Sequence, residues 1–168
     1  MAAVLVLASC SGAESSGAAS PDTPQPFGEP LGLSTDVLQT KGVADWEVTV
    51  SELTEDGSSN PEDEGVTVRF NARALLTDSE QVPVTTRESF DFVIIGGATA
   101  TTYEWSGEGC SDTGFDEGQL LETGNAVDGG VCISIAEEDL DHPDTLVSLT
   151  FNLDEAVYFG NAAPAAGA

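Results

Sequence analysis

Residues 65–76 read GVTVRFNARALL, and no other stretch of the chain alternates apolar and polar side chains so regularly. Every second residue from Val66 to Ala74 is apolar, whereas the residues between them are Thr67, Arg69, Asn71 and Arg73. A period of two residues is typical of a β-strand that buries one face and exposes the other. The stretch therefore predicts a long strand, with Arg69 and Arg73 on a solvated face where acidic residues of neighbouring strands can neutralise them.

Further strands are predicted on both sides of this one. The stretch from Trp46 to Val50 alternates in the same way, and so does the stretch from Val131 to Ile135. The predicted strands cover residues 33–39, 46–53, 65–76, 82–86, 90–95, 98–105, 118–123, 131–136, 146–153 and 156–159. Residues 137–144 are expected to form an acidic loop with at most one helical turn. Short strands at this spacing predict an all-β fold, an immunoglobulin-like antiparallel β-sandwich of about 7–9 strands.

Glycine pairs mark two predicted turns. Gly96-Gly97 follows the strand at 90–95. A tight hairpin needs the positive φ that glycine adopts without steric cost, so this pair predicts a hairpin. Asp128-Gly129-Gly130 is likewise predicted to be a turn before the strand at 131–136.

The N-terminal segment predicts a lipid anchor. A short apolar run leads into Leu7-Ala8-Ser9-Cys10, which resembles the lipobox of bacterial lipoproteins. In that pattern the cysteine receives a diacylglyceryl group, the preceding peptide is removed, and the new N-terminus is acylated. Several acyl chains hold a soluble domain stably on a bilayer. The alternative is an ordinary apolar N-terminus, because residues 1–9 lack the Lys or Arg that opens a signal peptide.

A tether and one domain are expected to follow the anchor. Residues 11–30 are small, polar and Pro-rich, and such a composition does not bury enough apolar surface to fold. We expect a signal peptide remnant at 1–9, the lipidated Cys10 and a disordered tether at 10–30, the sandwich at 31–160 and a disordered tail at 161–168. No run of 18 or more apolar residues is present, so the sequence predicts no membrane-spanning helix.

The charge balance of the chain excludes nucleic acid as a partner and bears on metal binding. Thirty acidic residues stand against four basic ones, which gives a net charge of −26. Nucleic acid is a polyanion that needs a basic patch, so it is excluded as a partner. The cluster Glu137-Glu138-Asp139 offers the oxygen ligands that calcium prefers, but residues 139–144 lack the glycine and terminal glutamate of an EF-hand. We therefore predict solvated acidic loops, no metal site and no cofactor.

The three cysteines agree with export from the cytoplasm. If Cys10 carries lipid, Cys110 and Cys132 remain, and an even remainder in an exported domain predicts one disulfide. The bridge would close a loop of about 22 residues and contribute about 3 kcal/mol by restricting the unfolded chain. Two cysteines with the distant His142 do not make a four-ligand zinc site.

Taken together, these parts resemble a family of secreted actinobacterial lipoproteins with one immunoglobulin-like domain, similar to the mycobacterial immunoprotective extracellular protein fold. The resemblance rests on the lipobox, the Pro-rich tether, Trp46-Glu47-Val48-Thr49-Val50, the strand at 65–76 and residues 124–135. It implies a sandwich over most of residues 29–160, a location on the extracellular face of the cell membrane, and pairing of Cys132 with an earlier cysteine. It implies no reaction, because the family is largely without assigned activity.

The residues favour a binding domain over an enzyme. His142, the only histidine, lies among acidic residues, and no Gly-x-Ser-x-Gly motif accompanies it. The long loop after Tyr103 offers Trp105 and Phe115 as a candidate surface for an unknown protein or small-molecule ligand, because aromatic side chains anchor interfaces. The alternative is that Tyr103 and Trp105 fill the core.

Two other functions stay open at this point. One is an accessory envelope protein with a structural or protective role and no ligand. The other is an enzyme that uses a pair of carboxylates, as glycosidases do. In each case we expect a monomer.

Overall fold

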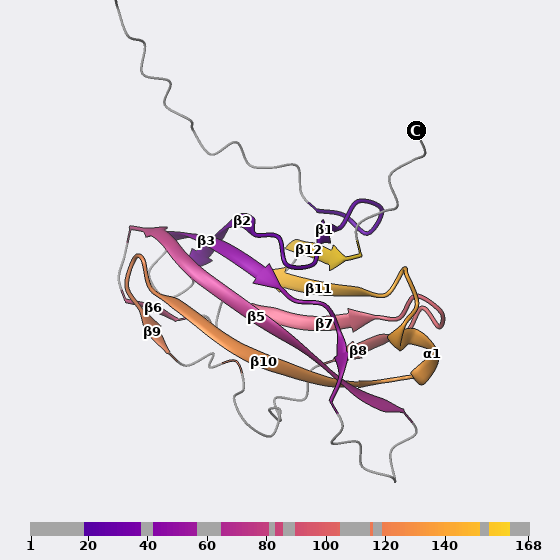
Figure 1. Cartoon of the computed structure of the whole chain (residues 1–168). Coiled ribbons are helices and arrows are strands. Elements are labelled where there is room, and N and C mark those ends of the chain that lie inside the picture. The colour runs from indigo at the N-terminus through magenta and orange to yellow at the C-terminus, as the bar shows by residue number, and fades with distance from the viewer. Residues whose placement is uncertain are drawn as a thin grey trace, which may run out of the picture.

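Two β-sheets packed face to face form the body of the protein (Figure 1). The computed structural model describes residues 19–37, 42–56, 65–80, 83–85, 90–104, 115, 119–151 and 155–161. The strands are β1 (Gln25–Pro26), β2 (Leu31–Val37), β3 (Gly42–Val50), β4 (Thr54–Glu55), β5 (Val66–Ser79), β6 (Val84–Thr85), β7 (Asp91–Ile95), β8 (Thr102–Glu104), β9 (Leu120–Leu121), β10 (Ala126–Ile135), β11 (Leu146–Phe151) and β12 (Glu155–Gly160). One short helix, α1 (Glu137–Leu140), lies between β10 and β11. The described residues thus form the predicted all-β sandwich.

The two sheets have different strand orders. The first sheet runs β1-β12-β11-β7-β8, and the second runs β10-β5-β3-β2, with β4 paired to β5. A separate two-stranded piece joins β6 to β9. Among the described residues, four of the twelve strands, β1, β4, β6 and β9, are two residues long, which leaves eight longer ones. That number lies within the predicted range of about 7–9 strands.

Strand β5 is the longest strand of the structure, and it confirms the alternation seen in the sequence. Val68, Phe70, Ala72, Ala74 and Leu76 are buried along it. It pairs antiparallel with β10 on one side and with β3 on the other. Because the side chains alternate, the residues between the buried ones, including both arginines, lie on the outer face of the second sheet.

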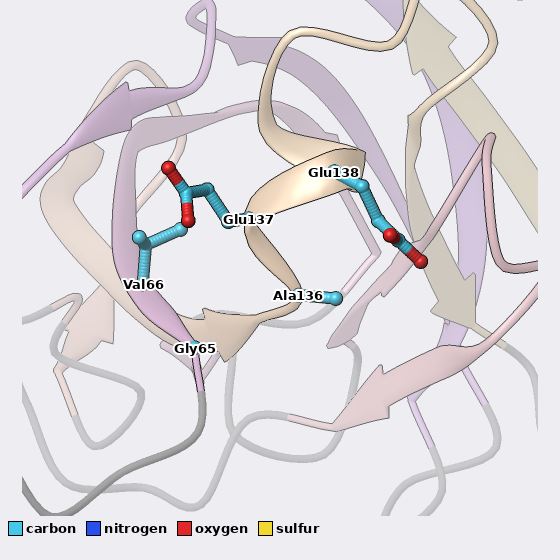
Figure 2. A pocket seen from close by; sticks show the side chains of 5 residues that line it. All are labelled: Gly65, Val66, Ala136, Glu137 and Glu138. Atoms are coloured by element: carbon cyan, nitrogen blue, oxygen red, sulfur yellow. The ribbon is translucent and has the colours of Figure 1, made fainter.

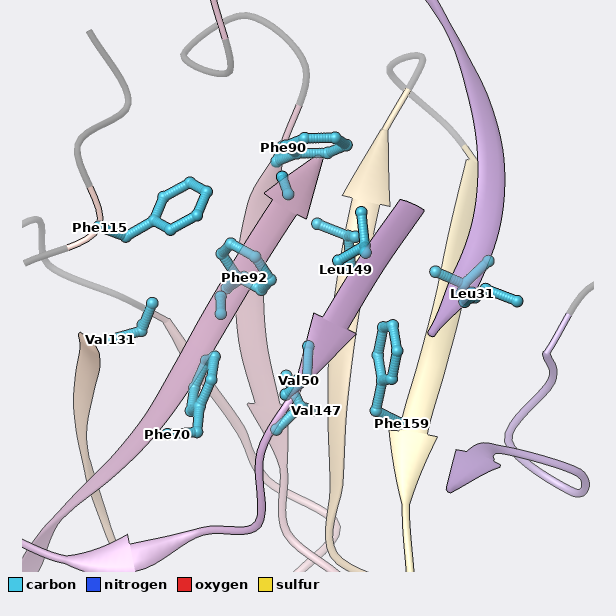
Figure 3. Packing of buried hydrophobic residues seen from close by; sticks show 14 of the residues in the cluster. Leu31, Val50, Phe70, Phe90, Phe92, Phe115, Val131, Val147, Leu149 and Phe159 are labelled. Atoms are coloured by element: carbon cyan, nitrogen blue, oxygen red, sulfur yellow. The ribbon is translucent and has the colours of Figure 1, made fainter. Parts of the chain in front are cut away.

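Aromatic rings join the two sheets across the core (Figure 3). Phe70 of β5 meets Phe92 of β7 edge-on, with ring centroids 5.7 Å apart, and Phe115 also meets Phe92 edge-on, at 5.6 Å. Trp46 of β3 packs edge-on against Phe90 at 5.1 Å. The indole nitrogen of Trp46 also donates a hydrogen bond to the Thr35 hydroxyl at 2.9 Å, so its one polar atom is satisfied inside the core.

The N-terminal edge of the sandwich begins earlier than the sequence predicts. Residues 19–30 were expected to belong to the tether, yet Ala19 is only 6% exposed and packs into the core. Strand β1 pairs in parallel with β12, and Gly28, with φ of 80°, turns the chain so that its amide donates to the carbonyl of Val50 in the second sheet. A two-residue strand has no pattern of its own, because its hydrogen bonds come from a distant partner.

The predicted turn at Asp128-Gly129-Gly130 is wrong. Strand β10 runs straight through these residues, and they pair with Arg73, Ala72 and Asn71 of β5. The actual turn lies at Gly124, where φ is 88°. Glycine inside a strand commonly marks a close approach of another group. That is the case here, since a Cβ on Gly130 would lie 2.8 Å from Nε of Arg69.

Most of the other longer strands follow the sequence closely. Strands β2, β3, β7, β11 and β12 overlap the predicted segments, and β2 forms one end of the second sheet. The acidic segment after β10 contains the single helical turn, α1. No helix among the described residues is long and apolar enough to cross a membrane.

The aromatic packing between the sheets yields a prediction for stability. Replacing Phe92 with Ala should destabilise the protein by about 3–5 kcal/mol, because it removes a ring in contact with both Phe70 and Phe115 and leaves a cavity. Leu120→Ala is the control, since Leu120 is 65% exposed and should change stability by about 0.5 kcal/mol or less. Urea denaturation monitored by tryptophan fluorescence measures both values. Equal losses for the two variants would contradict this account of the core.

Candidate functional site

The carboxylate of Asp139 organises one end of the sandwich. The Asp139 side chain, in α1, has no exposed surface. Its Oδ1 accepts the backbone amides of Ala98 at 2.8 Å and Thr99 at 3.0 Å. Its Oδ2 accepts the hydroxyls of Thr99 at 2.6 Å and Tyr103 at 2.7 Å. These donors belong to β8 and to the turn that leads into it, so one carboxylate ties α1 to the β7–β8 hairpin.

Two glycines leave room for this arrangement. A Cβ on Gly96 would collide with the Asp139 carboxylate, and a Cβ on Gly97 would collide with His142. The sequence predicts a positive φ for this pair, and that prediction is wrong. The positive φ of the turn is at Ala100, at 57°. The glycines are needed because the Asp139 and His142 side chains lie directly against the backbone.

The hydrogen bonds around Asp139 keep its carboxylate ionised. Burial raises the pKa of Asp139, but the hydrogen bonds from Thr99, Tyr103 and the Ala98 amide together outweigh burial, so the pKa lies below its ordinary value. A catalytic acid needs the opposite shift, toward neutral pH. As an ionised acceptor of four hydrogen bonds, the Asp139 carboxylate is suited to holding the hairpin in place.

A hollow of about 350 Å³ lies beside α1, where Gly65 and Val66 face Ala136, Glu137 and Glu138 (Figure 2). Glu137 points across the hollow toward Val66, whereas Glu138 points away. The third acidic residue of the cluster, Asp139, is held by its hydrogen bonds inside the protein. Among the described residues, no group of three or more His, Cys, Asp or Glu side chains could hold a metal ion.

The only histidine is engaged in local structure. His142 is half-buried, and its Nδ1 accepts the backbone amide of Asp144 at 3.3 Å. The Thr145 hydroxyl beside it donates to the Asp139 carbonyl at 2.7 Å and accepts the Gly97 amide at 2.9 Å. These contacts stabilise the segment between α1 and β11.

A second depression, of about 520 Å³, lies on the outer face of the second sheet. Thr49 of β3, Arg73 of β5 and Asp128 of β10 lie side by side across it, because the strand register pairs Arg73 with both of the others. Nε of Arg73 is 3.9 Å from Oδ1 of Asp128, and both side chains are more than half exposed. The rest of the lining comes from neighbouring rows and from the N-terminal segment, namely Gly28, Ser51, Asn71, Ala72 and Gly129. The prediction that acidic neighbours neutralise the arginines of β5 is thus confirmed at Arg73.

The predicted binding surface is only partly within the described structure. Phe115 is 5% exposed and packs edge-on against Phe92, and its amide donates to the carbonyl of Gly130 in β10. Phe115 is therefore a core residue, and its assignment to an exposed surface is wrong, because its ring fills the space between the sheets. Tyr103 is half-buried and binds Asp139. Trp105 lies outside the described residues.

The predicted cysteine sites are also only partly described. Cys132 lies in β10, as expected, with 9% of its surface exposed and its sulfur 3.6 Å from Oδ2 of Asp56. Cys110 and Cys10 lie outside the described residues, so the disulfide and the lipidation stay predictions.

The fold places the protein in the class of immunoglobulin-like β-sandwiches. Among solved structures, it is similar to MPT63, a secreted protein from Mycobacterium tuberculosis, with a TM-score of 0.59 and 15% sequence identity. The match covers 83% of this chain and 98% of the MPT63 chain. At this identity the likeness shows the fold alone. No protein-family model matches the chain, and no curated protein matches it.

The Asp139 network predicts a pH-dependent stability. Asp139→Asn should destabilise the protein by about 2–3 kcal/mol at pH 7, because the amide replaces a charged acceptor of four hydrogen bonds. Because the pKa of Asp139 is lower in the folded than in the unfolded protein, its ionisation stabilises the folded state at pH values above the unfolded pKa of 3.8. This stabilisation is lost as the pH falls through the pKa of the folded protein. The difference in the free energy of unfolding between the variant and the wild type should therefore become smaller below about pH 4.

Urea denaturation at pH 7 and pH 3 measures this gap. Asp141→Asn is the matched control, because Asp141 is exposed and lies two residues from Asp139. It removes the same charge without removing these hydrogen bonds. A gap that is equally large at both pH values would show that the charge of Asp139 is not what stabilises the hairpin.

The cysteine prediction is tested chemically. In a Cys10→Ser variant the two remaining cysteines are Cys110 and Cys132. Alkylation without reduction, followed by mass spectrometry, should find neither of them modified and should find one linked peptide. Reduction should then lower the melting temperature, with a loss of about 3 kcal/mol. Two alkylated cysteines in the folded oxidised protein would disprove the disulfide.

Proposed function

We propose that the protein is a lipid-anchored, extracytoplasmic binding domain without catalytic activity, and that it binds through the outer face of the β10-β5-β3-β2 sheet. The anchor is Cys10, and the tether is shorter than the sequence suggests, because residues 19–30 pack onto the sandwich. The lipobox at residues 7–10 and the likeness of the fold to a secreted protein support the location.

The depression on the outer face carries the proposal for binding. It combines a guanidinium, a carboxylate, a hydroxyl and an amide from three adjacent strands with the Ser51 hydroxyl just after β3 and with backbone at Gly28 and Gly129. Strands hold side chains at fixed spacings, so such a row is preorganised for recognition. The aromatic loop residue Phe115, the earlier candidate, supports the sheets from inside instead.

The buried carboxylate and the histidine are committed to structure. The buried carboxylate of Asp139 is ionised and accepts four hydrogen bonds, and His142 accepts a backbone amide. Neither is aimed into the depression on the outer face, which is lined by other residues. A binding role therefore agrees better with the geometry than a catalytic one.

The anchor is tested by fractionation. With its full signal region, in a host that processes lipoproteins, the wild-type protein should be found in the membrane fraction, and Cys10→Ser should be released, because the acyl chains would have no attachment site. Cys110→Ser is the control, since it should remain in the membrane fraction. Wild-type protein that is soluble and unmodified by mass spectrometry would refute the lipid anchor.

A further inference from the structure

We propose that the depression on the outer face binds a neutral carbohydrate. This inference rests on the proposed binding function and specifies its ligand class. The depression is defined by the row Thr49, Arg73 and Asp128 and by the adjacent Asn71. The backbone carbonyl of Asn71 accepts the backbone amide of Ser51 at 2.9 Å. Its volume of about 520 Å³ lies in the range of small-ligand sites.

The polar groups of the depression keep free hydrogen-bonding capacity. Arg73 makes a single contact with Asp128 at 3.9 Å, and no other partner of its guanidinium lies among the described residues. An exposed ion pair of this kind contributes about 0–1 kcal/mol, so a ligand can compete with it at little cost. The hydroxyl of Thr49 and the side-chain amide nitrogen of Asn71 likewise have no hydrogen-bond partner in the described part of the chain. The Ser51 hydroxyl, in contrast, accepts the backbone amide of Asn71 and donates to the Glu52 carbonyl.

These groups match the hydroxyls of a sugar. A hydroxyl both donates and accepts, so one can donate to the Asp128 carboxylate while its neighbour accepts from the Arg73 guanidinium. The carbon-rich face of a sugar ring needs a surface without polar side chains. Gly28 and Gly129 provide such a surface in the lining, whereas the Ala72 side chain is buried in the core.

The charge of the chain selects against ionic ligands. With a net charge of −26, the protein repels anions at long range. The acidic chain as a whole would attract a cation. At the depression, however, Arg69 and Arg73 lie on the same face of β5, and Arg73 is opposite Asp128. The arginines offset the charge of the Asp128 carboxylate at the depression. A neutral ligand is therefore disfavoured neither by the net charge of the chain nor by the arginines.

The expected affinity is low and is raised by the anchor. No aromatic ring lines the depression in the described structure, so a dissociation constant on the order of millimolar is expected. Many anchored copies facing a polymeric glycan convert such weak contacts into stable attachment through effective concentration. A lipid-anchored domain can therefore work with a shallow site.

The test uses the full chain carrying Cys10→Ser, which is not lipidated. Cellobiose, maltose, chitobiose and mannobiose are titrated against ¹⁵N-labelled protein by NMR, with digalacturonate as the anionic comparison. At least one neutral disaccharide should shift the amide signals of Thr49, Asn71, Arg73 and Asp128. Arg73→Gln combined with Asp128→Asn should weaken its binding at least tenfold. These side chains are exposed, so the fold should be kept, and a thermal melt checks this.

The matched control is Thr67→Ala with Ser134→Ala, a hydroxyl pair on the same outer face, outside the depression, with its oxygens 3.4 Å apart. It should leave the affinity unchanged. Absence of shifts with every neutral sugar, shifts located elsewhere, or tighter binding of digalacturonate would each overturn the carbohydrate proposal. The fractionation of wild type and Cys10→Ser is independent of these titrations, so loss of the anchor and loss of sugar binding are distinguished.

Discussion

The alternation along β5 is the constraint on which the rest of the structure depends. This strand pairs with β10, β3 and β4, and its buried side chains provide one wall of the core. A shift of its register by one residue would expose Phe70 and bury Arg69 or Asn71, which is prohibitive without partners. The contact between Phe70 and Phe92 then fixes where the second sheet lies. The same alternation places Arg73 on the outer face, so core and candidate site are set by one pattern.

Asp139 shows how a buried charge can be tolerated in an otherwise apolar sandwich. The chain passes from one sheet to the other between β10 and β11, and α1 lies in that crossover. The four hydrogen bonds to its carboxylate compensate for lost hydration and join the crossover to the β7–β8 hairpin. Removing the carboxylate alone would leave these donors unsatisfied in a closed space. Position 139 thus requires an aspartate because four donors converge on its carboxylate. Position 96 requires a glycine because a Cβ there would collide with that carboxylate.

The sequence predicts those parts of the fold whose signal is local. Alternation identifies β3, β5 and the second half of β10, residues 131–135, because these stretches alternate between apolar and polar side chains. It does not find β1, whose residues are held by pairing with β12 far along the chain. It misplaces the turn at Gly129 and Gly130, because ladder pairing with β5 outweighs their preference for turns. Phe115 has no periodic neighbours, so nothing in the sequence distinguishes a core ring from a surface ring.

The candidate site is hidden from the sequence for a related reason. Thr49, Arg73 and Asp128 lie far apart along the chain and meet only through strand register. The pairing of Asp128 with Arg73 exists because β10 continues through Gly129 and Gly130. The turn predicted at these residues would have taken Asp128 out of the row. The acidity of the chain does not locate the candidate site either. A net charge of −26 makes the overall long-range potential negative, and the net charge by itself does not mark one place on the surface. A ligand on this face would therefore have to be recognised by short-range hydrogen bonds, and those depend on the row of side chains that the sheet assembles.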